Sequence, residues 1–379
     1  MAKTVFFGPF IGEFGWELLW WQGWVKKLCR TEYASAHKVA ASFPGRQAFY
    51  PDVDEFWGHP EWFQQVPLSQ RAYFADFWRN GAPRGNVWRK RLQYGMRPVW
   101  ESVTLDRQAD GPDAEAQASK LLAEYQARLP AGTEWIVPFQ LNTCPASGVK
   151  VGLEVKPDAS RDQDFVAHRP RRQDQRFEQL EATAAGEKFA AERIPAGKHV
   201  IAVFPRSRAV RRPDKNWPQA KYDQLLKGLQ ERYPDALIAL LGEPRGAYYA
   251  DGVPDGCVDV INVDPALRMD AQVAVLNRAS LAIGGMSGAM LFAAFCGCPV
   301  LIYGFQQERY DYHHENALNT RMVYYPFMDA AVEDVLDLAA GMIEREIPPP
   351  GRDQTTWDPG ERFGVAGRLS RRVRLLMKV

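Results

Sequence analysis

The sequence predicts an α/β protein made of two doubly wound domains, in which parallel strands alternate with helices. Two observations carry this prediction. Short apolar runs alternate with segments of helical period in both halves of the chain, and 379 residues are more than one average domain requires. Hydrophobic residues make up 46% of the chain, which is enough to form two cores.

The first half alternates strands and helices with long insertions between them. Predicted strands are TVFF at 4–7, VAASF at 39–43 and EWIVPF at 134–139, and predicted helices are GWELLWWQGWVKKL at 15–28 and EAQASKLLAEYQARL at 115–129. The region rich in Trp, Pro and Arg that extends to about residue 110 is expected to be irregular. Together these elements predict an N-terminal domain over residues 1–190.

A polar, highly charged segment at 156–176 precedes the predicted domain boundary. It contains few large apolar residues, so we expect it to lie on the surface. The next segment, FEQLEATAAGEKFAAERI at 177–194, has the composition and period of a helix.

A second alternating series begins at HVIAVFP and predicts a C-terminal domain over residues 191–350. Its predicted strands are 199–205, 236–242, 257–262, 281–285 and 299–304, and its predicted helices are 218–233, 269–279 and 288–296. This alternation is typical of a parallel sheet with helices on both faces. After prolines 348–350, residues 351–379 contain a predicted basic helix, at about 360–378, that we expect to pack back on the first domain.

Charge, cysteine content and the N-terminus limit the class of protein. The formal net charge is +1, so no overall basic field marks a nucleic-acid-binding protein. The five cysteines show no CxxC spacing, which favours a reduced, cytoplasmic protein without a zinc site. Gly12, Glu13 and Glu17 interrupt the apolar N-terminal region, so we expect neither a signal peptide nor a membrane span.

A basic loop, FPRSRAVRRPDKNWP at 204–218, follows the first strand of the second half. It places five cations within ten residues: Arg206, Arg208, Arg211, Arg212 and Lys215. In open parallel sheets ligands bind beyond the carboxyl ends of the strands, and such cations suit a phosphate-bearing ligand there. An ordinary solvated loop is the alternative interpretation.

A glycine-rich turn in LAIGGMSGAMLFAAFCGCPVLIYG (281–304) joins a later strand to an apolar helix. Gly285, Ser287 and Gly288 would let backbone N–H groups approach an anion at the positive end of the helix dipole. A tight turn required for packing is the alternative. Because the basic loop follows another strand of the same sheet, the two segments are expected to hold one diphosphate from two sides.

An acidic residue in an unusual turn follows the first strand of the chain. In GPFIGEFG, Glu13 lies between Gly12 and Gly15, just before a tryptophan-rich helix. Glu13 either complements the positive end of that helix or takes part in chemistry. Glu17, one turn later, is the second candidate for either role.

These segments resemble the heptosyltransferase-like glycosyltransferases of GT-B architecture over roughly residues 199–305. The resemblance rests on the order and spacing of the strand that ends at Pro205, KNWP (215–218), ALLGEP (239–244), GMSG (285–288) and GCPVLIYG (297–304). It implies two Rossmann-like domains facing a central cleft. It also implies that Arg206, Arg208, Lys215, Gly285, Ser287 and Gly288 bind a nucleotide-sugar donor, which is a substrate and not a cofactor. Met286 departs from the family, which usually has an acidic residue there.

The resemblance also implies that Glu13 is the general base that deprotonates the acceptor hydroxyl, in an inverting reaction without a metal. Inverting transfer independently requires a carboxylate within reach of the attacking hydroxyl and positive charge near the departing diphosphate.

Two further segments concern the donor sugar and the acceptor. In YDYHHENALN (310–319), Glu315 and Asn316 are candidates for contacts to the hydroxyls of the ribose or the donor sugar, although an ordinary loop is equally compatible. Adjacent histidines point in different directions, so a metal site is disfavoured there. The Arg- and Trp-rich stretch 74–100 suits an anionic acceptor, either an acidic glycan or a DNA strand, or else is a packed insertion.

Three functions compete on these observations. The first is transfer of a sugar to a surface glycan or lipopolysaccharide, or, as a variant, to a hydroxymethylated base in DNA. The second is a non-catalytic module that binds nucleotides or phosphoglycans. The third is a nucleotide-sugar epimerase or hydrolase on the same fold.

Overall fold

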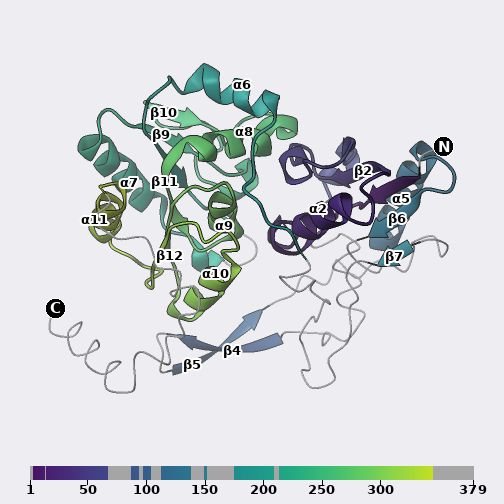
Figure 1. Cartoon of the computed structure of the whole chain (residues 1–379). Helices are drawn as coiled ribbons and strands as arrows, with labels where there is room; N and C mark the ends of the chain where they lie inside the picture. The colour runs from purple at the N-terminus through teal and green to yellow at the C-terminus, as the bar shows by residue number, and fades with distance from the viewer. Residues whose placement is uncertain are drawn as a thin grey trace. The chain divides into compact units, whose positions relative to one another are not determined.

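A computed structural model of the chain describes eight segments: residues 3–12, 14–66, 87–93, 97–103, 112–137, 149–151, 175–208 and 213–344. The chain divides into two compact units, residues 1–196 with 259–277 and residues 197–258 with 278–379. Each unit contains its own mixed α/β structure around a parallel sheet (Figure 1). The predicted fold class is therefore confirmed. The helix expected near 360–378 lies outside the described residues.

The first unit is built on a five-stranded sheet with the order β3-β2-β1-β6-β7. The strands are β1 (Thr4–Phe7), β2 (His37–Ser42), β3 (Glu55–Gly58), β6 (Glu134–Val137) and β7 (Val149–Val151). All four neighbouring pairs are parallel. Three successive residues of the central strand, Val5, Phe6 and Phe7, are fully buried. A strand with no solvent-facing side is typical of a parallel sheet covered on both faces.

The helices of the first unit include a π-helical turn that follows the short first helix. They are α1 (Phe14–Trp16), the π-helix η1 (Glu17–Trp21), α2 (Gln22–Arg30), the 3₁₀ turn η2 (Gln47–Phe49), α3 (Glu61–Gln64), α5 (Pro112–Arg128), α6 (Ala184–Arg193) and α8 (Pro265–Arg278). The Trp- and Arg-rich region, expected to be irregular, also contains an antiparallel pair, β4 (Val87–Gln93) and β5 (Arg97–Val103).

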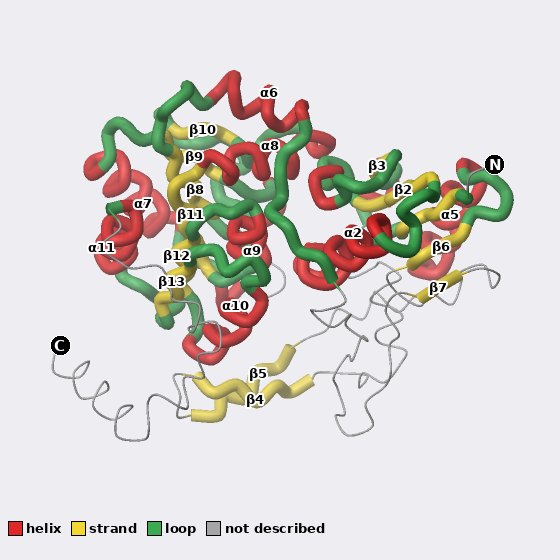
Figure 2. The backbone as a smooth tube through the Cα atoms, viewed as in Figure 1, coloured by secondary structure: helices red, strands yellow, loops and turns green. Residues whose placement is uncertain are grey.

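The second unit contains a six-stranded sheet with the order β10-β9-β8-β11-β12-β13 (Figure 2). The strands are β8 (Val200–Phe204), β9 (Leu237–Leu240), β10 (Cys257–Asp259), β11 (Ala279–Gly285), β12 (Val300–Tyr303) and β13 (Met322–Tyr325). The pairs from β9 through to β13 are parallel. Strand β13 was not predicted, because the alternating series inferred from sequence ended at PVLIYG.

Helices cover both faces of the second sheet. Figure 2 shows α7 (Gln219–Arg232) and α11 (Val332–Ile343) on one side and α9 (Gly288–Phe295) on the other. Helix α9 packs on β11 and β12, and α11 packs on α7 and the same two strands. Shorter helical segments join the strands at their ends: η6 (Pro213–Lys215), η7 (Pro244–Gly246), η8 (Gln306–Glu308) and α10 (Arg309–Glu315).

Helix α6 begins later than predicted. The expected helix over 177–194 starts only at Ala184, because extended Thr183 caps it and its Oγ1 accepts a hydrogen bond from Ala185 N–H at 3.3 Å. The fully buried carboxylate of Asp270, on α8, also caps the N-terminus of α6. It accepts hydrogen bonds from the backbone N–H groups of Thr183 and Gly186, both at 2.8 Å, and from Thr183 Oγ1 at 2.6 Å. The segment before α6 is therefore extended, and α6 is fixed to α8 by a buried charge.

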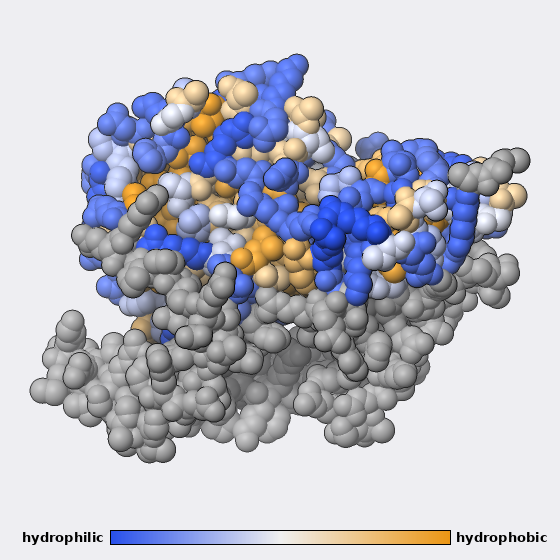
Figure 3. Space-filling view, in the orientation of Figure 1, coloured by the Kyte–Doolittle hydropathy of each residue, from blue (hydrophilic) through white to orange (hydrophobic). Residues whose placement is uncertain are grey.

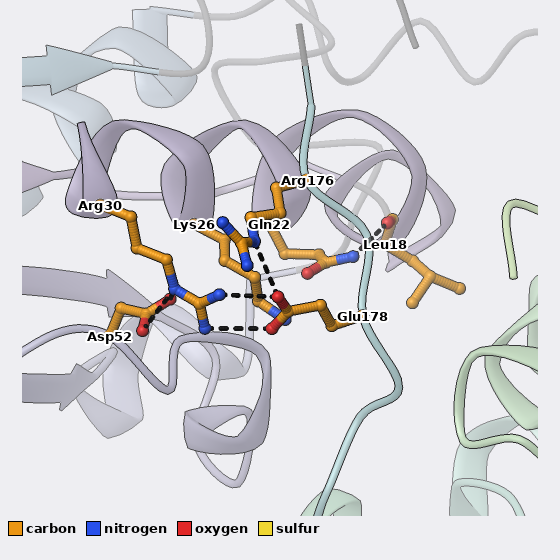
Figure 4. Close-up of polar contacts among 7 residues, drawn as sticks. All are labelled: Leu18, Gln22, Lys26, Arg30, Asp52, Arg176 and Glu178. Carbon is orange, nitrogen blue, oxygen red and sulfur yellow. Dashed lines mark hydrogen bonds and ion pairs between the residues drawn. The ribbon is translucent and has the colours of Figure 1, made fainter. Parts of the chain in front are cut away.

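That extended segment is held on α2 by the ion cluster of Figure 4. Arg30 on α2 donates two hydrogen bonds to the Glu178 carboxylate, at 2.6 and 3.0 Å, and a third to Asp52 at 2.9 Å. Lys26, which is buried, lies 3.8 Å from the same Glu178 carboxylate. Burial lowers the pKa of Lys26, whereas the hydrogen bonds from Arg30 lower the pKa of Glu178 to about 2.

A glycine in the middle of α2 permits this close contact. A Cβ atom at Gly23 would lie 2.7 Å from Phe177 Cε1, and the carbonyl of Gly23 accepts a hydrogen bond from Arg176 N–H at 2.8 Å. The cost of glycine within a helix is thus offset by direct packing of the extended segment.

The face shown in Figure 3 is mainly hydrophilic over the described residues of both units, with smaller hydrophobic groups between. Within the described ranges, none of the helices combines the length and the apolar character that crossing a membrane requires.

The Glu178 cluster predicts a specific acid sensitivity. Because the folded pKa of Glu178 lies below its ordinary value of 4.5, its stabilising contribution is present above pH 4.5 and is lost as the pH falls toward about 2. Glu178→Gln should flatten this part of the curve of unfolding free energy against pH. The effect should be modest, since the side chain is 37% exposed. Urea titrations between pH 3 and 7 measure it, with exposed Glu192→Gln as the control; equal acid sensitivity in wild type and Glu178→Gln would contradict the prediction.

Candidate functional site

The order of strands in the second sheet reverses at β8. From β8 the chain continues to β9 and β10 on one side, and it then returns to β11, β12 and β13 on the other. Connections that leave two neighbouring parallel strands in opposite directions leave a crevice beyond their carboxyl ends, which is the usual ligand site of such sheets. Phe204 of β8 is in register with Gly284 of β11, so the basic loop and the glycine-rich turn begin side by side.

The basic loop is held in shape by Asn216. The side chain of Arg206 donates from Nη1 to Asn216 Oδ1, and Arg208 N–H donates to the same oxygen at 3.1 Å. Asn216 Nδ2 in turn donates to the Arg208 carbonyl at 2.8 Å. Arg206 is buried and Arg208 is exposed. Arg211 and Arg212 lie outside the described residues, so Arg206 and Arg208 are the arginines of this loop whose positions support a role.

Lys215 ends the loop with its charge balanced. Its Nζ lies 2.9 Å from Glu308 Oε2, and the side chains are 13% and 23% exposed. Glu308 belongs to η8, which follows β12, so this ion pair ties the basic loop to another segment at the carboxyl edge of the sheet. If Lys215 binds a phosphate, its ammonium group must therefore be shared between the phosphate and Glu308.

The glycine-rich turn leaves the start of α9 open to an anion. Helix α9 begins at Gly288, and Ser287 before it is extended with a side chain that makes no capping hydrogen bond. The first turn contains no acidic residue. The first N–H groups of a helix have no partner within the helix, and the helix dipole places positive charge at this end. The turn can therefore accept a phosphoryl group between these N–H groups and the Ser287 hydroxyl.

Two glycines in this turn lie in tightly packed positions. A Cβ atom at Gly284 would lie 2.6 Å from Met290 Sδ, and a Cβ atom at Gly285 would lie 3.1 Å from Tyr303 Cε2 and 3.4 Å from the Lys215 carbonyl oxygen. The last distance shows that the backbone of the basic loop passes close to the turn. The structure thus brings together the two segments that the sequence predicted to face one ligand.

The segment that leads to Glu315 is helical, which excludes the alternative of an ordinary loop for residues 309–315. Glu315 is the last residue of α10 and is half-buried. The side chain of Asn316 is fully engaged in the following turn, donating to Thr320 O at 2.7 Å and accepting from Thr320 N–H at 3.1 Å. Burial, reinforced by Arg309, lowers the pKa of His313 to about 4, so this imidazole is neutral near pH 7. Among the described residues, no three His, Cys, Asp or Glu side chains are grouped closely enough to hold a metal ion.

In the first unit, Glu13 lies outside the described residues, but the chain before it is firmly held. Phe10 N–H donates to Ala41 O at 2.9 Å, and His59 Nε2 donates to the Phe10 carbonyl at 2.7 Å. Because Nε2 carries the proton, the other ring nitrogen of His59 accepts from Tyr125 O–H, at 2.8 Å. This buried chain of hydrogen bonds fixes the backbone three residues before Glu13.

Glu17, the second candidate base, has a structural role. Its side chain is completely buried and accepts hydrogen bonds from Ser42 Oγ at 2.5 Å, from Tyr50 O–H at 2.6 Å and from Arg46 Nη1. Burial, followed by the nearby Glu17, raises the pKa of Tyr50 well above its ordinary value, so Tyr50 remains a donor. A carboxylate with three buried donors and a balancing cation is not available to an acceptor hydroxyl. Sequence analysis missed these partners because they lie 25 to 33 residues away from Glu17.

Comparisons with known proteins agree with the two-sheet α/β fold described above. Residues 168–346 match the family model described as glycosyltransferase family 9 (heptosyltransferase). The structure is similar to that of Escherichia coli ADP-heptose LPS heptosyltransferase II, with a TM-score of 0.52 and 13% identity over 91% of this chain and 99% of that chain. It also matches the family 9 glycosyl transferase from Veillonella parvula, with a TM-score of 0.48 and 12% identity over 91% and 97%. A search of curated proteins gives no significant match. The heptosyltransferase similarity confirms the predicted GT-B fold.

The Glu17 cluster predicts an asymmetric response to substitution. Arg46→Ala leaves the Glu17 carboxylate buried without a cation and removes the guanidinium from the rings of Phe14 and Phe43, so stability should fall by about 3–5 kcal/mol. Arg176→Ala, which removes an arginine with a 54% exposed side chain, should cost at most about 1 kcal/mol.

Denaturant unfolding of both variants measures this difference. The double variant Glu17→Gln with Arg46→Met removes both charges and should recover part of the loss. Equal stability losses in Arg46→Ala and Arg176→Ala would contradict the structural role of Glu17.

Proposed function

We propose that the chain is a glycosyltransferase that transfers a sugar from a nucleotide-sugar donor to a glycan hydroxyl, because residues 168–346 match the model of glycosyltransferase family 9 (heptosyltransferase). The observation that carries the proposal is that the basic loop and the glycine-rich turn follow neighbouring strands, with Phe204 and Gly284 in register, at the reversal of the second sheet. Sugar transfer releases a nucleoside diphosphate, and preorganised cations and N–H donors stabilise the charge that develops on it.

Each candidate site residue of the second unit has a separate proposed role in binding the donor. Arg206 and Arg208 bind phosphate oxygens by charge and hydrogen bonding. Ser287 and the N–H groups that begin at Gly288 bind the second phosphoryl group, and Gly285 allows the ligand to approach the backbone. Lys215 contributes charge that it shares with Glu308, and Glu315 contacts sugar hydroxyls.

Glu13 is the proposed general base. The engagement of Glu17 by Ser42, Arg46 and Tyr50 supports this assignment, because it leaves Glu13 as the other carboxylate of residues 12–17. A base that deprotonates the acceptor hydroxyl as it attacks the anomeric carbon from the face opposite the diphosphate gives inversion. We propose that the cations and helix N–H groups, without a resident metal, balance the charge of the leaving diphosphate.

The acceptor is proposed to be a glycan. One matching structure is of an ADP-heptose LPS heptosyltransferase, which makes a nucleotide-activated heptose and a lipopolysaccharide core the first pair to test. A DNA acceptor has no support among the similarities reported above, and the near-zero net charge does not favour it. The family match favours transfer over the binding-module and epimerase alternatives.

Nucleotide release tests the reaction class. The protein is incubated with ADP-, GDP- and UDP-sugars, including ADP-heptose, with and without truncated lipopolysaccharide, and products are identified by mass spectrometry. Acceptor-dependent release together with a gain of one sugar residue on the acceptor is the expected result. An epimerised donor, or binding without any turnover across the panel, would overturn the proposal.

Arg206→Ala should weaken nucleoside diphosphate binding by about 1.5–3 kcal/mol, because a charge-assisted contact to phosphate is lost. Arg245→Ala, which removes an exposed arginine of η7, is the matched control and should leave the affinity unchanged. Titration calorimetry on both variants measures the difference. Unchanged affinity in Arg206→Ala would show that the site has been misplaced.

Glu13→Gln should lower turnover by roughly 10²–10⁴-fold while donor affinity stays close to wild type, because glutamine retains the size of the side chain but cannot accept the proton. Steady-state kinetics and donor titration measure the two effects separately, with exposed Glu61→Gln as the control. Near-normal turnover with a stability loss of up to about 1 kcal/mol would instead assign Glu13 to the helix dipole.

A further inference from the structure

Tyr303, the last residue of β12, contacts the basic loop through a second tyrosine. Its side chain is completely buried, and its hydroxyl lies 2.7 Å from the hydroxyl of Tyr222 on α7, which is also completely buried. The Tyr222 oxygen accepts a hydrogen bond from the backbone N–H of Arg206 at 3.2 Å, and the same N–H also contacts Phe204 O at 2.9 Å. A chain of two hydroxyl groups therefore joins β12 to the start of the basic loop.

The same residue contacts the glycine-rich turn directly. Tyr303 is in register with Gly285, and its carbonyl accepts a hydrogen bond from Met286 N–H at 2.9 Å. Its ring carbon Cε2 lies 3.1 Å from the position that a Cβ atom of residue 285 would occupy. The Tyr303 ring therefore occupies the space that a side chain at position 285 would need, and glycine leaves this space to the ring.

A stacked indole completes the connection at the other end of the loop. The rings of Trp217 and Tyr303 are 4.0 Å apart and nearly parallel, with an angle of 18°. Trp217 follows Asn216, the residue that holds the loop in shape, and its own Nε1 donates to Met328 O at 2.9 Å. From one buried position, Tyr303 thus contacts the end of the loop and the glycine-rich turn, and it is linked to the beginning of the loop through Tyr222.

The Tyr303 hydroxyl keeps its proton at all physiological pH values. Burial raises the pKa of Tyr303 well above its ordinary value, and the neighbouring Tyr222 adds to the effect. Burial also raises the pKa of Tyr222 to about 12. Both groups therefore remain neutral hydrogen-bonding groups, and their contribution is positional and not one of charge.

We propose that Tyr303 is a positioning residue that sets the spacing between the Arg206 loop and the Gly285 turn, and thereby makes the site selective for a diphosphate over a monophosphate. This inference rests on the proposed function, since it takes these two segments as the donor's phosphate site. A diphosphate contacts both segments at once, so its affinity depends on their spacing. A monophosphate contacts one of them and is insensitive to it.

The test compares two hydroxyl deletions with a matched control. Tyr303→Phe and Tyr222→Phe each break the link between the hydroxyl groups while leaving the rings in place. Tyr33→Phe removes a buried hydroxyl of the first unit, whose partner is Glu134 at 2.6 Å. Calorimetric titration of each protein with ADP, GDP and UDP, and with AMP, GMP and UMP, gives the ratio of diphosphate to monophosphate affinity. Melting temperatures are recorded in parallel.

For the nucleotide that binds best, diphosphate affinity should fall about 3- to 10-fold in Tyr303→Phe and Tyr222→Phe, as expected for one lost hydrogen bond. Monophosphate affinity should change less than about twofold, and Tyr33→Phe should leave the ratio unchanged. A lower melting temperature alone cannot alter this ratio. If Tyr303→Phe does not fold, Tyr222→Phe tests the same link from its other end.

An unchanged ratio in the folded variants, with diphosphate bound normally, would overturn the role of Tyr303 and leave the proposed function intact. Equal losses of diphosphate and monophosphate affinity would also overturn it, because they would show general damage to the site. If the wild-type protein binds none of the six nucleotides, the proposed function itself fails and the inference fails with it.

Discussion

The position of β8 between β9 and β11 determines where ligand chemistry can occur in the second unit. All the pairs from β9 to β13 are parallel, so their carboxyl ends lie along one edge, and the chain leaves β8 and β11 toward opposite sides. Any residues placed directly after these two strands become neighbours, whatever their distance in sequence. The loop at 205–217 and the turn at 285–288 use this placement, and the short distance between the Gly285 position and the Lys215 carbonyl follows from it.

Backbone groups at this edge of the sheet need hydrogen-bond partners, and buried aromatic side chains supply them. Trp217, Tyr222 and Tyr303 are fully buried and contribute apolar area to the core. Trp217 Nε1 donates to Met328 O, the Tyr222 hydroxyl accepts from Arg206 N–H, and the Tyr303 hydroxyl donates to that of Tyr222. Aromatic residues with one polar group suit such a boundary, because they satisfy backbone groups without placing another charge in the interior. The charged side chains of Arg206 and Lys215 then lie at the ends of the strands, where Asn216 and Glu308 orient them.

The local signals in the sequence were sufficient to predict this edge, whereas contacts between distant residues were not predictable. Apolar runs of strand length and the glycines of GGMSG indicated β8, β11 and the start of α9, because these features depend on residues next to one another. The late start of α6 depends on Asp270, which is 87 residues from Thr183, and the engagement of Lys215 depends on Glu308, 93 residues away. Neither Asp270 nor Glu308 can be recognised as a partner from the sequence around Thr183 or Lys215. The same holds for the ligands of Glu17, so two acidic residues of one turn could not be distinguished from sequence.

The N-termini of α6 and α9 differ in whether side chains of the protein already satisfy their N–H groups. At α6, the carboxylate of Asp270 accepts from Gly186 N–H and Thr183 N–H, and Thr183 Oγ1 accepts from Ala185 N–H, so the positive end of the dipole is already neutralised inside the protein. At α9, the capping position holds Ser287 with no capping hydrogen bond, and no acidic side chain lies in the first turn. The sheet places an arginine loop beside the second terminus and a buried carboxylate beside the first. An anion would therefore complement the start of α9 but would be redundant at α6, and this difference supports the proposal that the diphosphate of a glycosyl donor binds beyond the ends of β8 and β11.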